Sequence, residues 1–266
     1  MQTLIYIESK ENALYKETKK LKDRKGRTKL KKYLIEGFRL VEEALKANAK
    51  IETIFFVENV NTKTESLIKE YNYKGKLYGI NKNLFLDICN TENPQGILAV
   101  IEMESDSNTL DGEFYLLCDK VQDPGNLGTI IRTAHASGVD GIILTKGTVD
   151  IYNDKTIRST MGSMFYVPII IDNDLSKLKK LKEDGFSIIS TSLEGSKDFF
   201  DEDLTGKTVM TVGNEGNGVS DEVYEISDKN VKIPMPGGAE SLNVGVATSI
   251  ILYERLRQKI SLLKFK

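Results

Sequence analysis

Apolar and amphipathic stretches alternate along the second half of the chain, and this alternation restricts the fold more than any other feature. The apolar stretches are nearly continuous, which is typical of strands buried on both faces. Regular alternation of such strands with helices predicts an α/β fold, with a parallel sheet covered by helices on both sides. Strands are expected at 114–120, 141–145, 167–171, 186–191, 208–213 and 230–235, and helices at 126–137, 154–163, 175–183, 219–225 and 241–260.

A smaller α/β unit is predicted before that region. Its apolar residues have helical spacing from Leu34 to Leu45, and strands are expected at 51–57 and 95–101. Further helices are expected at 64–71 and 81–90. The stretch 104–112 is polar and lacks a hydrophobic period, so the domain boundary is placed within it. The predicted domains are therefore 1–107 and 108–266.

Composition favours a globular protein of the cytoplasm. With 266 residues, 40% of them hydrophobic, the chain is long enough to form two cores. The N-terminal residues lack the pattern of a secretory signal, and no apolar stretch is long enough to span a membrane. Only two cysteines occur, Cys89 and Cys118, and neither lies in a metal-binding spacing. We therefore expect reduced cysteines, no metal site and no membrane partner.

Positive charge is concentrated near the N-terminus although the formal net charge is −2. Ten lysines and arginines fall between Lys16 and Lys32, opposed only by Glu17 and Asp23. Such a run is often a solvated helix face. However, Gly26 interrupts it, which predicts a helix that ends in a basic loop containing Lys25 and Arg27. A loop of this kind suits contact with phosphates, without recognition of base sequence.

Three loops at the ends of predicted strands carry the candidate chemistry, and the first follows strand 114–120. It contains Asn126 and leads into a helix whose apolar stripe points away from Arg132. An arginine beside a strand-to-helix loop can bind phosphate in a bidentate manner. The alternative is an ordinary surface arginine after a turn formed by Asp-Pro-Gly.

The second loop, 212–220, places three glycines and Glu215 after strand 208–213. Glycines allow the backbone to approach a ligand closely, and exposed backbone groups can bind an adenine edge or a carboxylate. The glycine order differs from the dinucleotide-binding motif of Rossmann folds. A plain turn is the alternative interpretation.

The third loop, 233–243, passes through prolines and glycines and leads into the last predicted helix. Ser241 and Asn243 lie at the expected start of that helix, where each can simply cap exposed amides. Ligands of parallel sheets collect at the carboxyl ends of the strands, where all three loops are expected to lie.

Together these motifs resemble the SpoU (TrmH-like) family of the SPOUT superfamily. Asn126, Gly128 and Arg132 match its first motif, Gly213-Asn-Glu215-Gly its second, and 233–243 its third, including Ser241-Leu-Asn243. The resemblance covers 114–258, and the sequence from Leu34 is similar to the RNA-binding domain that often precedes such a catalytic domain.

The resemblance implies that the catalytic domain contains a deep trefoil knot whose loops bind S-adenosylmethionine. Gly213, Ile233 and Leu242 would contact this cofactor, largely through backbone atoms. The implied reaction transfers a methyl group to a ribose 2′-hydroxyl of RNA, and the implied assembly is a homodimer.

The same resemblance assigns roles around that reaction. Arg132 would be the leading catalytic residue. We expect it to stabilise the forming alkoxide, because arginine is a poor base. Asn126, Glu215, Ser241 and Asn243 would orient Arg132 or the ribose. Arg158 resembles a recurrent basic position that contacts RNA, although it can equally be a solvated helix arginine. His135, the only histidine, is interpreted as a structural or surface residue.

Several functions stay open from the sequence. The N-terminal domain favours ribosomal RNA as the substrate, with transfer RNA as the alternative. A non-catalytic RNA-binding protein that keeps the fold is a second alternative, although such a protein would be expected to lack Arg132, Glu215 or Asn243. A base-methylating enzyme of the same superfamily would be expected to differ in the third motif.

Overall fold

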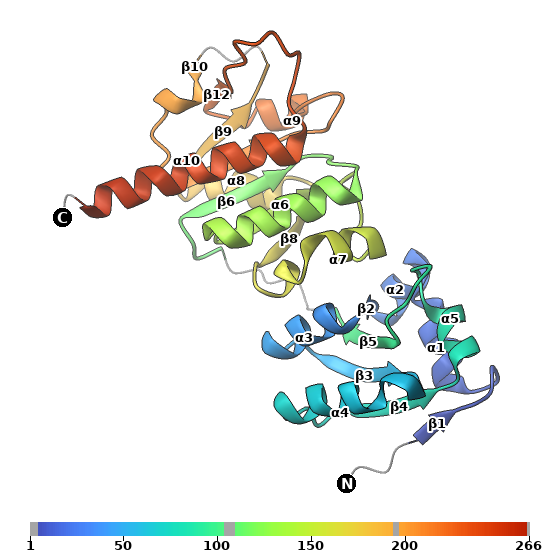
Figure 1. Ribbon diagram of the computed structural model, residues 1–266. Coiled ribbons are helices and arrows are strands. Elements are labelled where there is room, and N and C mark those ends of the chain that lie inside the picture. Colours follow the sequence, from blue (N-terminus) through green and yellow to red (C-terminus); the bar gives the residue numbers. More distant parts are fainter. Residues whose placement is uncertain (1–4, 104–109, 194–196, 265–266) are drawn as a thin grey trace. The chain divides into compact units, whose positions relative to one another are not determined.

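The computed structural model describes residues 5–103, 110–193 and 197–264, and these form two compact units. One unit combines residues 1–105 with the segment 152–165, and the other combines 106–151 with 166–266 (Figure 1). Both units are α/β, as predicted. The predicted boundary at residue 107 lies outside the described residues.

The first unit is built on a five-stranded mixed sheet with the order β1-β4-β3-β5-β2. The strands β1, β4 and β3 are parallel to one another, and β5 runs antiparallel to β3 and β2. The strands are β1 (Ile5–Ile7), β2 (Lys32–Glu36), β3 (Ile51–Phe56), β4 (Lys76–Ile80) and β5 (Ile97–Glu102). Side chains alternate between two cores, since Tyr33 and Ile35 of β2 join one cluster and Leu34 joins the other.

Five helices of the N-terminal residues cover this sheet. They are α1 (Ala13–Lys20), α2 (Arg24–Leu30), α3 (Phe38–Lys46), α4 (Asn61–Glu70) and α5 (Lys82–Ile88). The predicted loop at Gly26 is wrong, because Gly26 lies inside α2. A Cβ atom at Gly26 would lie 1.9 Å from the carbonyl oxygen of Lys20, so the glycine allows α2 to pack against the end of α1.

The segment 152–165 belongs to the core of the first unit, although it lies between two strands of the second. It contains α7 (Asp154–Thr160) and the short helix η2 (Ser163–Phe165). Ile157 is 2% exposed within the cluster of β2, α3 and β5, and Tyr152 packs on Tyr33 with ring centroids 4.6 Å apart. Periodicity predicted helix 154–163 but could not show which core it joins.

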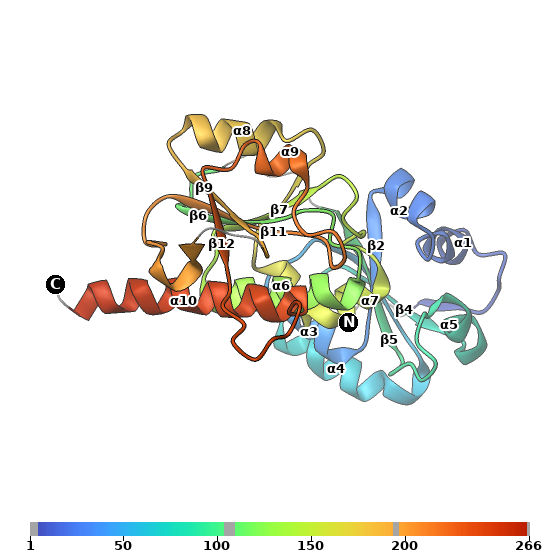
Figure 2. The same ribbon diagram turned by 90° about the horizontal axis from the view of Figure 1, so that it is seen from above.

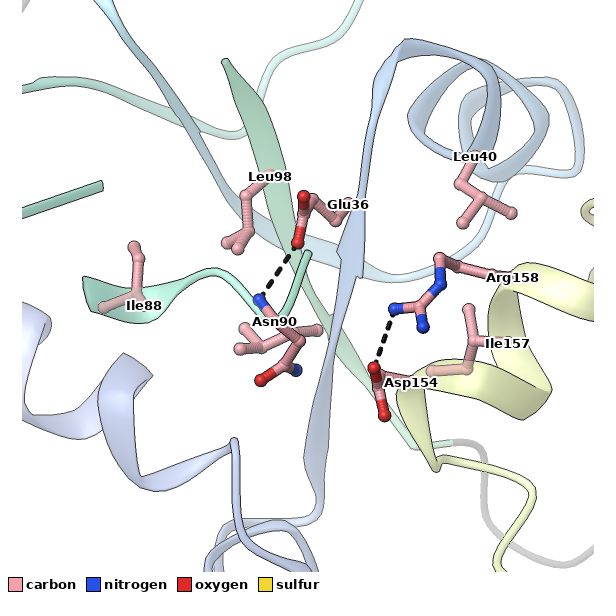
Figure 3. Close-up of a pocket in the computed structure, with 9 residues that line it drawn as sticks. Glu36, Leu40, Ile88, Asn90, Leu98, Asp154, Ile157 and Arg158 are labelled. Atoms are coloured by element: carbon pink, nitrogen blue, oxygen red, sulfur yellow. Dashed lines mark hydrogen bonds and ion pairs between the residues drawn. The ribbon is translucent and has the colours of Figure 1, made fainter. Parts of the chain in front are cut away.

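A small cavity lies between α7 and β2 in this unit (Figure 3). Glu36, Asn90 and Arg158 contribute its polar lining. Arg158 Nη1 lies 2.7 Å from Asp154 Oδ2, so its charge is paired within its own helix. The cavity volume of about 10 Å³ has room for about one water molecule. It is too small for a nucleotide.

The second unit contains a seven-stranded sheet whose strand pairs are all parallel, as predicted. The order is β10-β12-β9-β11-β6-β7-β8. The strands are β6 (Phe114–Cys118), β7 (Gly141–Thr145), β8 (Ile169–Asp172), β9 (Ser187–Thr191), β10 (Lys197–Asp198), β11 (Thr208–Val212) and β12 (Lys229–Lys232). Every residue of β6, β7 and β11 is buried, because helices cover both faces.

Helices α8 (Ser176–Glu183) and α9 (Asp221–Tyr224) cover one face of this sheet, and α6 (Pro124–Ser137) and α10 (Val244–Lys264) cover the other (Figure 2). The helices α6 and α10 pack closely, since a Cβ atom at Gly245 would lie 3.3 Å from Thr129 Cγ2. Among the described residues, no helix is long and apolar enough to cross a membrane.

The last helix begins at Val244 rather than at the predicted Ser241. Asn243 Oδ1 accepts hydrogen bonds from the amides of Gly245 (3.0 Å) and Val246 (3.3 Å), so Asn243 caps the helix. Ser241 lies outside the helix and is not its cap. Similarly, β12 ends at Lys232, two residues before Pro234, which lacks the amide needed to continue the ladder.

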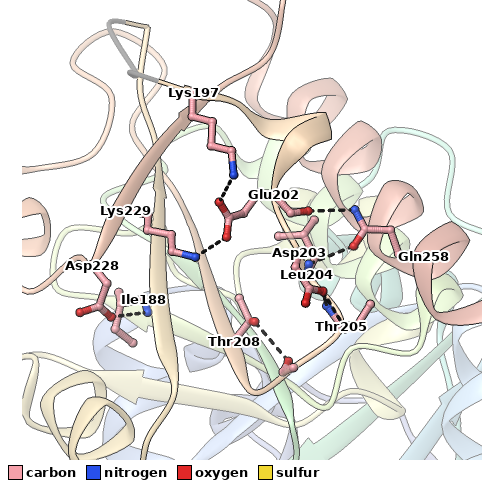
Figure 4. Close-up of polar contacts among 11 residues, drawn as sticks. Ile188, Lys197, Glu202, Asp203, Leu204, Thr205, Thr208, Asp228, Lys229 and Gln258 are labelled. Atoms are coloured by element: carbon pink, nitrogen blue, oxygen red, sulfur yellow. Dashed lines mark hydrogen bonds and ion pairs between the residues drawn. The ribbon is translucent and has the colours of Figure 1, made fainter. Parts of the chain in front are cut away.

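The edge of the sheet at β10 and β12 is connected to α10 through Glu202, by its side chain on one side and its backbone carbonyl on the other (Figure 4). Glu202 is 4% exposed and pairs with Lys197 and Lys229. Gln258 on α10 donates to the Glu202 carbonyl at 3.0 Å. Burial raises the pKa of Glu202, but the two lysines outweigh it and hold the pKa below its usual value. The carboxylate is therefore ionised and paired with two lysines, and we interpret this cluster as structural.

Candidate active site

The first two motif loops leave the sheet side by side. Strands β6 and β11 are parallel neighbours, and Cys118 at the end of one is in register with Val212 at the end of the other. The amide of Asp119 continues this pairing by donating to Val212 O at 2.8 Å. The loop before α6 and the loop after β11 therefore begin at the same sheet edge.

Glu215 connects these two loops. Its Oε1 accepts hydrogen bonds from the amide of Asp123 (3.1 Å) and from Asn126 Nδ2 (2.9 Å). Its Oε2 accepts from the amide of Gln122 (3.2 Å). The carboxylate thus lies at the N-terminus of the 14-residue helix α6, where the helix dipole favours a negative charge.

The third loop joins through Asn243. The Nδ2 of Asn243 donates to Asn126 Oδ1 at 2.9 Å, while Asn126 donates to Glu215 with its own Nδ2. One residue from each motif therefore meets in a continuous chain of hydrogen bonds. We call Asn126, Glu215 and Asn243 the carboxamide hub. Asn126 and Asn243 are 117 positions apart in the sequence, so the fold is what brings them together.

Glu215 remains ionised in this environment. Burial raises its pKa, but the hydrogen bonds from Asn126 and from the amides of Gln122 and Asp123 outweigh that effect. The pKa of Glu215 is therefore held below its usual value. At neutral pH the hub contains a fixed negative charge that acts only as a hydrogen-bond acceptor.

Gly213 occupies a position that only glycine fits. A Cβ atom there would lie 2.0 Å from the carbonyl carbon of Gly218, so any side chain would collide with backbone. Asn214 and Gly218 pair as an isolated bridge, with N···O distances of 2.8 and 2.9 Å. The loop is thus a tight turn, and its glycines serve that turn whatever ligand it binds.

Arg132 and Ser241 are not connected to the hub. Arg132 lies on α6 with its side chain exposed, and within the described residues it has neither an ion pair nor a side-chain hydrogen bond. Ser241 and Leu242 are exposed before α10, and Ile233 is half-buried just after β12. His135, one turn beyond Arg132, stacks on Tyr166 with ring centroids 4.7 Å apart.

The three residues predicted to bind RNA have different surroundings. Lys25 is exposed on α2, whereas Arg27 is only 8% exposed. Arg27 Nη1 donates to the carbonyl oxygens of Leu21 (3.2 Å) and Lys22 (2.9 Å), so its guanidinium caps the C-terminal end of α1. Arg158 is half-buried in the first unit.

Two polar residues at this sheet edge were not identified from the sequence. Asp119 is 1% exposed and accepts hydrogen bonds at 2.7 Å from both Thr145 and Ser220. Asn214 fills the turn after β11. A charged residue that directly follows the apolar strand 114–118 was the available signal for Asp119. Within the described part of the chain, no group of three His, Cys, Asp or Glu side chains is placed to bind a metal.

Comparison with protein families supports the resemblance that the motifs carry. Residues 113–253 match the SpoU rRNA Methylase family. Residues 12–99 match the MRM3-like substrate binding domain. The two matches together span both α/β regions of the chain.

Similar proteins share almost the whole chain. A 23S rRNA (guanosine(2553)-2'-O)-methyltransferase, RlmP of Bacillus subtilis, is 40% identical over 93% of this chain and 97% of its own length. A 23S rRNA (uridine(2479)-2'-O)-methyltransferase of Streptomyces viridochromogenes is 29% identical over 91% and 88%.

Solved structures show the same similarity. The SpoU methyltransferase AviRb from Streptomyces viridochromogenes, in complex with the cofactor AdoMet, is 29% identical and superposes with a TM-score of 0.85 over 94% of this chain and 99% of that one. An AdoMet-bound rRNA methyltransferase from Sinorhizobium meliloti is 32% identical, with a TM-score of 0.82 over 96% and 98%.

Proposed function

This chain belongs to the SpoU rRNA methylase family, and from that premise we propose which residues carry its reaction and which RNA it methylates. It is a ribose 2′-O-methyltransferase that acts on ribosomal RNA and uses S-adenosylmethionine. The carboxamide hub is the observation that supports the assignment of residues, because it brings one polar group from each of the three motifs to one sheet edge.

Residues near the hub fit the cofactor. Gly213 follows the buried strand β11 in a tight turn, and Leu242 is an exposed leucine, 37% accessible, in the third loop. A glycine backbone and exposed apolar side chains suit a ligand with an adenine ring and an apolar chain. We assign Gly213, Ile233 and Leu242 to its binding. The bound cofactor supplies the methyl group from its sulfonium.

We assign the remaining residues to the RNA ribose. The 2′-hydroxyl must lose its proton and lie near the methyl group, so a cation near its oxygen lowers the barrier. Arg132 is exposed and unpaired among the described residues, which leaves all its donors available for a phosphate and the reacting oxygen. Asn126, Asn243 and Ser241 orient the ribose, and Glu215 holds Asn126.

We propose 23S rRNA as the substrate. RlmP and the Streptomyces viridochromogenes enzyme are both named for nucleotides of 23S rRNA, and both match this chain across its first unit as well as its second. By contrast, a TrmH/SpoU tRNA-modifying enzyme from A. aeolicus covers only 56% of this chain. The whole-length similarity therefore favours ribosomal over transfer RNA.

A basic surface around α2 suits the RNA backbone. Several other cations of this region already have partners, because Lys19 pairs with Asp87, Lys32 pairs with Glu17 and Glu52, and Lys22 donates to backbone carbonyls. Five exposed cations have no ion pair or side-chain hydrogen bond within the described residues, and we call them the α2 surface: Lys20, Arg24, Lys25, Lys29 and Lys31. We propose that this surface, rather than Arg27, contacts phosphates.

Removing charge from the α2 surface should weaken RNA binding and flatten its salt dependence. We expect the triple change Arg24→Gln, Lys25→Gln and Lys29→Gln to reduce the slope of log affinity against log salt by about 2 to 3, since each phosphate contact contributes about 0.7 to 0.9. Filter binding to a 23S rRNA fragment across a salt series measures this slope.

The matched control removes three exposed lysines from α8, namely Lys179, Lys180 and Lys182. It lowers the net charge equally but should leave the slope near that of the unmodified chain. Equal slopes for the two triple variants would refute the proposal that the α2 surface contacts RNA phosphates.

An exposed apolar stripe on α10 supports a homodimer. Val246, Tyr253 and Ile260 recur every seven residues and are 49%, 51% and 45% exposed, while Ile251 and Leu252 of the same helix are buried. We propose that the same stripe of a second copy covers it, since a symmetric dimer joins identical patches.

We also propose that the chain between β11 and α10 forms the trefoil knot of this family.

Introducing a charge into the α10 stripe should produce a monomer. We expect Tyr253→Glu to halve the mass measured by light scattering, because an unpaired carboxylate would be buried in the interface. Leu86→Glu, at a similarly exposed apolar residue (44%) on α5 of the first unit, should leave the mass unchanged. A monomeric unmodified chain, or a Tyr253→Glu variant that remains dimeric, would exclude this interface.

The assigned substrate can be tested in cells. Maps of 2′-O-methyl nucleotides in 23S rRNA should lose a single site when the gene is deleted and regain it when the gene is restored. Loss of a site in transfer RNA instead would show that the substrate assignment is wrong.

A further inference from the structure

Asp119 is a buried carboxylate that the proposed mechanism does not use. It follows β6 directly and is 1% exposed. Thr145 Oγ1 donates to its Oδ1 and the amide of Ser220 donates to its Oδ2, both at 2.7 Å. A carboxylate so far from water is costly unless each oxygen is hydrogen-bonded, so its two partners are a requirement of the fold.

These bonds fasten the far end of the 213–220 loop to the sheet. Ser220 is the last residue of that loop and lies 101 positions after Asp119 in the sequence. Thr145 is the last residue of the neighbouring strand β7. Thr145 Oγ1 also accepts the amide of Lys120 at 3.1 Å. Asp119 therefore links the ends of two strands to the residue at which the loop closes.

Asn214 fastens the near end of the same loop. Its Nδ2 donates to Lys120 O at 2.9 Å, and its Oδ1 accepts the amides of Gly216 (2.9 Å) and Asn217 (3.1 Å). Lys120 has a φ of 55°, a left-handed conformation that residues other than glycine rarely adopt. Such a conformation persists only where its surroundings hold it, and here both its amide and its carbonyl are bonded.

We propose that Asp119, together with Asn214, is a positioning residue that fixes the 213–220 loop in the conformation required for S-adenosylmethionine binding. The inference rests on the proposed function, which assigns Gly213 to that cofactor. Asp119 acts through the loop and touches no reacting atom. Because Glu215 lies within the same loop, Asp119 and Asn214 also determine where the Glu215 carboxylate lies relative to Asn126.

The change Asp119→Asn tests the anchor with minimal change of shape. The negative charge is lost and one oxygen becomes an amide nitrogen, which cannot accept a hydrogen bond, so the side chain can no longer accept from both Thr145 and the Ser220 amide. We expect binding of S-adenosylmethionine, measured by calorimetry, to weaken about tenfold or more. Hydrogen exchange at the amides of 213–220 should accelerate by a similar factor in the ligand-free protein.

Asp172→Asn is the matched control. Asp172 is also 1% exposed and accepts a backbone amide, that of Leu178 at 2.9 Å, but it anchors the start of α8. This variant should bind S-adenosylmethionine as the unmodified chain does, with normal exchange at 213–220. If Asp119→Asn does not fold, Asn214→Ala at a half-buried position should show the same weakened binding and faster exchange.

Three outcomes would overturn the inference. In the first, Asp119→Asn folds and keeps both normal affinity and normal exchange. In the second, the control loses affinity equally, and in the third, Asn214→Ala behaves as the unmodified chain. Failure of the unmodified chain to bind S-adenosylmethionine would instead refute the proposed function. Exchange at 213–220 would still report whether Asp119 anchors the loop.

Discussion

Replacing Arg132 with alanine is expected to lower the rate of methyl transfer about a hundredfold or more, because one lost donor to a developing oxyanion costs that much in comparable sites. Binding of S-adenosylmethionine should be unchanged, since Arg132 makes no hydrogen bond to the described residues of the three loops. Single-turnover methylation of a 23S rRNA fragment, combined with calorimetry for the cofactor, separates these two effects.

His135→Ala is the control on the same helix. His135 lies one turn from Arg132 and stacks on Tyr166, so its loss should alter local packing without removing a catalytic donor. We expect this variant to keep nearly full activity. An Arg132→Ala variant that methylates normally, or that loses cofactor binding while folded, would remove Arg132 from its assigned role.

Replacing Glu215 with alanine should reduce both kcat/KM and cofactor affinity. The change leaves the amides of Gln122 and Asp123 and the Nδ2 of Asn126 without their acceptor. A hydrogen bond to a charged group contributes about 1.5 to 3 kcal/mol when buried, and partial exposure reduces this. We therefore expect a loss of at least about tenfold in kcat/KM, which corresponds to about 1.4 kcal/mol.

Glu225→Ala provides the comparison, because Glu225 is an exposed carboxylate of the same unit that lies outside the hub. It should retain the activity of the unmodified chain. If Glu215→Ala were as active as Glu225→Ala, the hub would be dispensable for the reaction.

The ionisation of Glu215 predicts how stability and the rate of methyl transfer depend on pH. Its folded pKa lies below the ordinary value, so the stability it contributes is present above the unfolded pKa and is lost as pH falls through the folded pKa. Between about pH 6 and 8 the carboxylate stays ionised, and the rate should not titrate with Glu215. A step in the rate within that range that disappears in Glu215→Gln would contradict this.

The sequence predicted six of the seven strands described in the second unit, because buried parallel strands leave a clear apolar signal, and it missed only β10, which is two residues long. It also predicted that Asn126, Glu215 and Asn243 share one site, since their loops all follow strands of one sheet. Their hydrogen bonds confirm that the three meet. The roles of these residues in the reaction stay a prediction.

Other features of the fold could not be predicted from the pattern of apolar and charged residues. Hydrophobic periodicity shows that 154–163 is amphipathic, but Ile157 packs into the first unit, and periodicity carries no information about which core accepts a face. A run of basic residues likewise does not distinguish Lys25, which is exposed, from Arg27, which serves the end of α1. Burial and hydrogen bonding assign these roles only after the fold has formed.

The central claim is that this chain places a methyl group on a ribose 2′-oxygen of 23S rRNA. Purified protein should be incubated with methyl-labelled S-adenosylmethionine and 23S rRNA from cells lacking the gene, followed by alkaline hydrolysis and mass spectrometry. We predict label in one alkali-resistant dinucleotide, because a 2′-O-methyl group blocks cleavage of the adjacent phosphodiester. Label on a base, or no label with folded protein, would contradict the claim.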